Sequence, residues 1–168
     1  MFISVLNLFK VGIGPSSSHT IGPMVAANDF IARVENSFSK YVGHSLLIRC
    51  VLKGSLAYTG KGHGTDRAVA LGLHNYTAKT LANMDVDALV KDIWQQSKIS
   101  LRNDQTVKFV PEKHIFFDKE EPLSEHPNGM IFELITDLNE VVFSETYFSI
   151  GGGFINTLDE IHHLVAPL

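Results

Sequence analysis

Cysteine is scarce in this sequence: Cys50 is the single one among 168 residues. A disulfide within the chain is therefore excluded. The N-terminal run MFISVLNLFK has no positive residue before its apolar stretch and no clear cleavage site, so we expect no signal peptide. Both features favour the reducing cytoplasm as the location of the protein. Because Cys50 lies in an apolar run, we expect it to be a core residue.

Further absences exclude whole classes of function. Lysine and arginine form no cluster and the net charge is −4, which argues against a nucleic-acid-binding surface. No histidines occur in H-x-x-x-H or H-E-x-x-H spacing, so we expect no metal site in this chain. Residues 11–28 carry no charge, but their glycines and prolines exclude a membrane span. The G-x-S-x-G turn of many serine hydrolases and the Gly-Lys-Ser/Thr of a phosphate-binding loop are also missing.

The remaining pattern is that of an ordinary globular domain, in which helices and strands alternate before a final run of strands. Apolar spacing predicts helices over residues 4–10, 18–35, 64–76 and 85–98, the last with Asp85 as its N-cap. Alternating or β-rich runs predict strands over residues 44–54, 113–119, 129–138 and 140–150, the last two joined by a hairpin at Leu138–Asn139. We therefore expect an α+β fold with two layers, one antiparallel sheet of about four strands and helices on one face.

Hydroxyl side chains gather in the run SSSHT at residues 16–20, just before a predicted helix. A helix N-terminus has unpaired N–H groups and a partial positive charge, so Ser16, Ser17, Ser18 and Thr20 would be placed to bind a carboxylate. The imidazole of His19 would be able to exchange protons with that ligand. The alternative interpretation is a redundant helix cap in a polar loop.

Three further stretches combine glycine with polar residues at the edge of a predicted element: GKGHGTD at 60–66, EHPNGM at 125–130 and SIGGGF at 149–154. In the first, we expect His63 to be exposed and held by the backbone of a turn between two glycines. In the second, His126 enters a turn at the start of a strand. Each stretch also fits an ordinary turn, and the glycine run fits either a hinge or closely packed backbone.

Taken together, GIGPSSSHTIGPM, GSLAYTGKGHGTDRAVALGL, EHPNGM and YFSIGGGF closely resemble the β domain of the bacterial iron–sulfur L-serine dehydratases, in this order and spacing. The resemblance implies that residues 1–155 form this domain and that residues 156–168 begin a linker or tail towards a cluster-binding α domain. It implies a fold similar to the accessory substrate-binding domain of some phosphoglycerate dehydrogenases. The family converts L-serine to pyruvate and ammonia without pyridoxal phosphate. A [4Fe–4S] cluster, held by cysteines of the α domain, acts as a Lewis acid on the substrate hydroxyl.

Cys50 alone cannot supply three thiolates for such a cluster, so we expect this chain to bind none and to be inactive by itself. The resemblance implies L-serine as the ligand and the α domain as a partner, in the same chain or as a second subunit. The apolar tail at residues 156–168 favours an excised fragment over a separate subunit. A homodimer through β domains is expected, and neither nucleic acid nor a membrane is expected as a partner.

Resemblance and residue chemistry together predict the roles at the site. His63 is the leading acid/base candidate, and His19 and His126 are secondary ones. Ser16, Ser17, Ser18 and Thr20 are the predicted ligands of the serine carboxylate, and Asn128 is expected to contact the amino group or the carboxylate. Lys61 is a rival base. The contrasting hypothesis is a regulatory serine-binding and oligomerisation module with no catalytic residue of its own.

Overall fold

The structure is a computed structural model that describes residues 17–37, 40, 45–102 and 104–165. The predicted helix over residues 4–10 and the candidate residue Ser16 lie outside the described residues. In chain order the elements are α2 (Ile21–Ser37), β1 (Leu46–Lys53), α3 (Ser55–His63), α4 (Thr65–Leu73), η2 (Thr80–Asn83), α5 (Val86–Gln96), β2 (Lys98–Ser100), β3 (Thr106–Lys108), α6 (Pro111–His114), β4 (Ile115–Asp118), β5 (Gly129–Thr136), β6 (Val141–Gly151), β7 (Phe154–Thr157) and α7 (Leu158–Val165).

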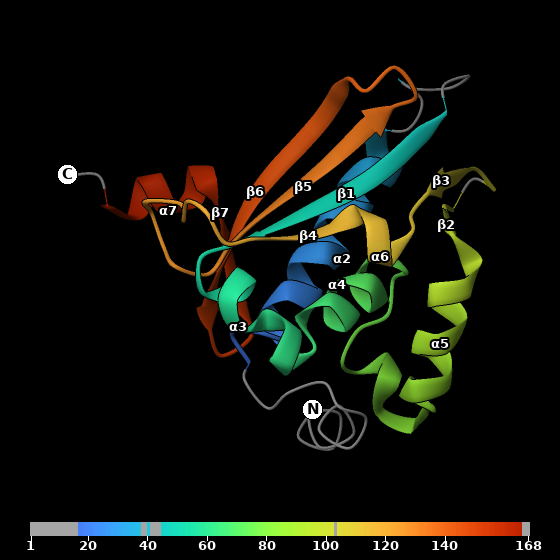
Figure 1. Ribbon diagram of the computed structural model, residues 1–168, viewed down its shortest axis with the longest axis horizontal. Coiled ribbons are helices and arrows are strands. Elements are labelled where there is room, and N and C mark those ends of the chain that lie inside the picture. The colour runs from blue at the N-terminus through green and yellow to red at the C-terminus, as the bar shows by residue number, and fades with distance from the viewer. Residues whose placement is uncertain (1–16, 38–39, 41–44, 103, 166–168) are drawn as a thin grey trace.

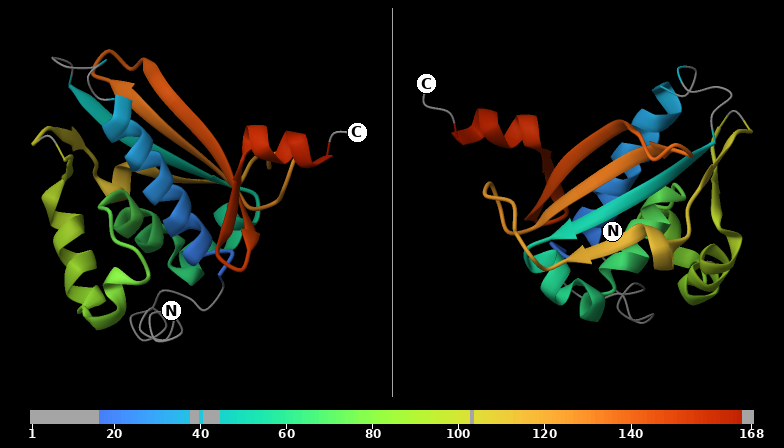
Figure 2. Two further views of the ribbon diagram at one scale, coloured as in Figure 1. Left: turned by 180° about the vertical axis from the view of Figure 1, so that it is seen from behind. Right: turned by 45° about the horizontal axis from the view of Figure 1, so that its top comes forward.

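Helices cover one face of the sheet, as expected. Seen from behind, α2 runs across the sheet, with α4 and α5 beside it (Figure 2). In β1 the side chains at alternate positions from Leu46 to Leu52 are buried, whereas Leu47, Arg49 and Val51 are half-buried. This alternation is typical of a strand with one buried face, because successive side chains of a strand point to opposite sides, and it agrees with the strand predicted over residues 44–54. Cys50 is fully buried, which confirms it as a core residue. Among the described residues, no helix is long and apolar enough to cross a membrane.

The fold is α+β, but the prediction of an antiparallel sheet of about four strands is wrong. The sheet has seven strands in the order β2-β3-β1-β5-β6-β7, and β4 also pairs with β1 (Figure 1). β1 pairs with β3 and β4 in parallel and with β5 antiparallel, so the sheet is mixed. The long helical connection after β1 permits this parallel return. The strand predicted over residues 113–119 is confirmed as β4, whereas β2, β3 and β7 were not predicted, because segments of three or four residues are too short to show a clear period.

The predicted helices around residues 18–35, 64–76 and 85–98 are confirmed as α2, α4 and α5. The Asp85 side chain accepts a hydrogen bond from the Ala88 backbone N–H, as predicted for an N-cap. The prediction of a turn around His63 is wrong, because residues 55–63 form helix α3. Gly64, with φ of 72°, ends α3 and begins α4, so glycine is needed where the two helices meet.

The C-terminal segment also has more structure than a tail. Residues 154–157 form β7 and residues 158–165 form α7, which projects from one side of the sheet (Figure 1). The α7 residue His162 contacts Glu125 through Nε2 and a carboxylate oxygen at 3.0 Å. This helix therefore packs on the domain, and its role as the start of a linker stays a prediction.

Gly22 in α2 allows the start of this helix to approach β6. A Cβ at residue 22 would lie 2.0 Å from the Oγ and 2.9 Å from the Cβ of Ser149. We expect Gly22→Ala to lower the free energy of unfolding by about 1–3 kcal/mol through overpacking. In Gly62→Ala, by contrast, the new Cβ meets nothing within 4 Å, so the helix should gain about 0.5–1 kcal/mol. Urea denaturation of both variants checks this, and equal shifts would contradict the packing.

His74, at the end of α4, should make stability depend on pH. Burial lowers its pKa to about 4, against about 6.5 in an unfolded chain. The unfolded state therefore binds more protons between these values, so the stability from neutral His74 is complete above pH 6.5 and is lost as the pH falls towards 4. The loss should be of order 1–3 kcal/mol across this window. Thermal unfolding of His74→Gln should show a flatter pH slope than the parent, whereas His163→Gln, which removes an exposed imidazole, should leave it unchanged. A parental slope in His74→Gln would overturn the assignment.

Candidate functional site

The four glycine- and hydroxyl-containing stretches meet at one end of the sheet, where the strands converge near the start of α2 (Figure 1). Hydrogen bonds join them directly. The Gly152 N–H donates to Ser17 Oγ at 3.1 Å, and the Ser55 N–H donates to the Pro127 carbonyl at 2.8 Å. The Asn128 side-chain amide donates to the Ser149 carbonyl at 3.1 Å. Stretches that lie more than a hundred residues apart in the sequence thus form one site.

His19 and His63 lie against each other at its centre, with ring centroids 4.7 Å apart. Each imidazole comes from a different stretch, His19 from the turn before α2 and His63 from the last residue of α3. The Thr65 hydroxyl donates to the His19 carbonyl and so ties the start of α4 to the same turn. The prediction that His63 is oriented by its own backbone alone is wrong, since the ring packs on His19.

Both ring nitrogens of His19 contact hydroxyls. Ser18 Oγ lies 2.8 Å from Nδ1, and Ser55 Oγ lies 3.0 Å from Nε2. Burial lowers the pKa of His19, the proximity of His63 lowers it further, and a hydrogen bond with Ser55 acts in the opposite direction. The ring is therefore held in a fixed orientation in which the neutral form is favoured.

His63 differs from His19 in this respect. Its ring is half-buried, and it makes no hydrogen bond to any residue in the part of the chain that the structure describes. Among the described residues, the ring nitrogens of His63 thus have no hydrogen-bond partner, whereas those of His19 both contact hydroxyls.

Some of the other predicted residues lie at the candidate site, and others pack around it or stabilise its turns. Ser17 is half-buried, and its Oγ accepts a hydrogen bond from Gly152, whereas Thr20 is only 2 % exposed. Thr20 is thus part of the packing beneath the turn. His126 and Asn128 lie in the loop that contacts Ser55, but the His126 Nδ1 accepts from the Asn128 N–H at 3.0 Å, so this imidazole braces its own turn.

Lys61 points away from the histidine pair. Its Nζ lies 2.9 Å from Asp66 Oδ2 and 5.7 Å from the centroid of the Phe117 ring. An ammonium held in this way is not directed at the space beside His63, so the geometry does not favour Lys61 as the base.

Ser55 is a site residue that sequence reasoning missed. It follows Gly54, whose φ of 58° and lack of a Cβ let the Pro127 carbonyl approach; a Cβ at residue 54 would lie 2.2 Å from that oxygen. The only signal in the sequence was a glycine–serine pair at the end of a predicted strand. The glycine run at 151–153 is a tight connection between β6 and β7, with positive φ at all three residues, and its backbone holds Ser17.

The residues present do not fit an iron–sulfur cluster. Cys50 is the one cysteine in the sequence, its side chain is buried in β1, and burial raises the pKa of its thiol well above the usual range. Within the described ranges, no group of three or more His, Cys, Asp or Glu residues could hold a metal ion.

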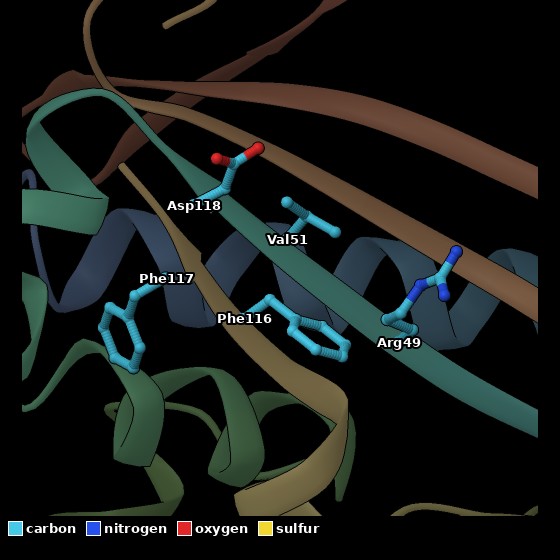
Figure 3. A pocket seen from close by; sticks show the side chains of 5 residues that line it. All are labelled: Arg49, Val51, Phe116, Phe117 and Asp118. Carbon is cyan, nitrogen blue, oxygen red and sulfur yellow. The ribbon is translucent and has the colours of Figure 1, made fainter. Parts of the chain in front are cut away.

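A wide hollow of about 370 Å³ lies on the other face of the sheet, away from the histidine pair. It is lined by Arg49, Val51, Phe116, Phe117 and Asp118 from β1 and β4 (Figure 3). Its charged groups are paired, Arg49 with Glu133 at 2.8 Å and Asp118 with Lys53 at 2.7 Å. The hollow contains none of the predicted site residues, so the candidate site remains at the histidine pair.

Comparisons with known proteins show which family the chain resembles. A family model described as serine dehydratase beta chain matches residues 4–160. An L-serine dehydratase of Helicobacter pylori is 40 % identical over 161 residues, covering 96 % of this chain and 34 % of the relative. One from Streptomyces coelicolor is 38 % identical over 161 residues, with 96 % and 35 % covered. L-serine dehydratase 2 of Escherichia coli is 39 % identical over 166 residues, with 95 % and 34 % covered. The chain spans about a third of the length of these relatives.

Proposed function

The chain belongs to the serine dehydratase beta chain family, and from this premise we propose that it binds the carboxylate and moves a proton in β-elimination from L-serine. The observation that carries the proposal is the contrast within the histidine pair. His19 has both nitrogens on hydroxyls, whereas His63 has both nitrogens open among the described residues. In such a pair, one imidazole is held in place and the other is able to exchange a proton with the substrate.

His63 is the proposed base. Elimination breaks the Cα–H and Cβ–O bonds of L-serine and gives water and aminoacrylate, which then hydrolyses to pyruvate and ammonia. An imidazole is well suited to take the Cα proton near neutral pH. The lowered pKa of His19 helps, because a neutral His19 does not repel the positive charge that His63 gains with the proton.

The turn before α2 is the proposed carboxylate site. Ser17 and Ser18 lie where the positive end of the α2 dipole favours an anion. Ser18 also holds His19, so a carboxylate at this turn would lie close to the histidine pair. Asn128 is the proposed contact of the substrate amino group, supported by its place in the loop that touches Ser55.

The departing hydroxyl needs a group that this chain does not supply, because Cys50 is a single, buried cysteine. We propose that a [4Fe–4S] cluster in a separate α domain acts as the Lewis acid there. The proposal also includes a domain boundary near residue 155 and a homodimer through β domains. It further includes a cytoplasmic location and a fold like that of the phosphoglycerate dehydrogenase domain.

The test joins this chain to the remaining two thirds of a full-length relative, in place of the matching third. We expect the chimera to release pyruvate from L-serine. The isolated chain, after anaerobic treatment with iron and sulfide, should bind no stoichiometric iron and release no pyruvate. Cluster binding and turnover by the isolated chain would contradict the proposal that the cluster lies in a separate α domain.

A further inference from the structure

A second cavity, of about 200 Å³, lies between the end of α3, α5, α6 and β4. Residues that line it include Lys61, Asp66, Trp94, Glu112, Ile115 and Phe117. Successive helix residues turn by about 100°, so Lys61 and His63 point to nearly opposite sides of α3. The cavity is therefore separate from the histidine pair.

The walls of the cavity carry one positive and two negative charges. Lys61 pairs with Asp66, yet its own side chain is 77 % exposed and that of Asp66 only 9 %. The Glu112 carboxylate has no hydrogen bond or ion pair to any described residue. A ligand that brings both a carboxylate and an ammonium group matches this set, because each of its charges then meets an opposite one.

Apolar side chains form the rest of the wall. Phe117 lies beneath the Lys61 ammonium, and Trp94 and Ile115 complete the surface. Aromatic faces attract an ammonium group and also bury an aliphatic side chain. The lining thus combines two opposite charges with a small apolar floor.

We propose that this cavity is a second ligand site, which takes a small aliphatic α-amino acid as its zwitterion. The carboxylate binds the exposed ammonium of Lys61, and the ammonium group of the ligand binds Glu112. The aliphatic side chain packs on Trp94 and Phe117. This site is independent of the proposed elimination at His63.

The chain offers a direct probe, because Trp94 is its single tryptophan. Titration with L-valine, which has no hydroxyl to eliminate, should change the Trp94 fluorescence saturably. Isovalerate, which lacks the ammonium group, and isobutylamine, which lacks the carboxylate, should each bind at least about tenfold more weakly. Backbone amide shifts around Lys61, Asp66 and Glu112 should move with L-valine in NMR spectra of the same chain.

Variants separate this site from the proposed active site. Lys61→Gln and Glu112→Gln should each weaken L-valine binding by about tenfold or more, since each loses a charged contact. Lys79→Gln, an exposed lysine elsewhere, and His63→Ala should bind L-valine as the parent does. Absence of both a fluorescence change and amide shifts up to the solubility of L-valine would overturn the proposal. So would equal binding of isovalerate, or loss of binding in His63→Ala.

Discussion

Replacing His63 by alanine in the assembled chimera should lower kcat for L-serine by about 10²–10⁴-fold, the usual contribution of a general base. KM should change little, because His63 is proposed to act on the proton and not on the carboxylate. His63 is the member of the histidine pair whose ring nitrogens have no partner among the described residues. Steady-state pyruvate formation measures both constants.

His163→Ala is the matched control, because it removes an exposed imidazole whose Nδ1 contacts the backbone carbonyl and the carboxylate of Asp159, one turn earlier. It should keep the parental kcat. If His63→Ala instead changed only the cooperativity or the apparent affinity for L-serine, the regulatory hypothesis would hold and His63 would not be catalytic.

Removing the Ser17 hydroxyl should raise KM for L-serine by about tenfold, since one charged hydrogen bond contributes roughly 1.5–3 kcal/mol and 1.4 kcal/mol is a factor of ten. Serinamide, in which a neutral amide replaces the carboxylate, should be a poor substrate of the parent enzyme. Kinetics of Ser17→Ala and of the exposed control Ser144→Ala, measured with both compounds, test this expectation.

Ser17 also accepts a hydrogen bond from Gly152, so its loss affects stability as well. The melting temperature of Ser17→Ala separates the two effects. A lowered melting temperature with unchanged KM, together with efficient turnover of serinamide, would show that the hydroxyl only supports the β6–β7 connection and that SSSHT is a redundant cap.

Local patterns predicted the elements that have a clear period. The helix at 86–96 has an N-cap and one apolar face, and the strand at 46–53 alternates between buried and half-buried residues. The parallel pairing of β1 with β3 and β4 could not be predicted, because it depends on how the chain returns to the sheet after the helices that follow β1. Helix α3 was not predicted, because it has only nine residues and its glycines lower the helix propensity of the segment.

The candidate site, like the fold, depends partly on local sequence patterns and partly on tertiary contacts. His19, His63 and Ser17 were predicted because each lies in a distinctive stretch, and the structure brings these stretches together. The different surroundings of the two imidazoles were not predictable, since the contact of His19 Nε2 depends on Ser55, 36 residues away. Likewise, the contact of Lys61 with Asp66 depends on the bend at Gly64.

The most direct test of the central claim is chemical rescue of His63→Ala in the chimera, measured with L-serine carrying deuterium at Cα. If His63 takes the Cα proton, turnover by the variant should show a larger deuterium isotope effect than the parent, because proton removal becomes rate-limiting. Added imidazole should restore part of the rate by replacing the missing base. A variant rate that does not respond to imidazole, with an isotope effect equal to that of the parent, would contradict the assignment of His63 as the base.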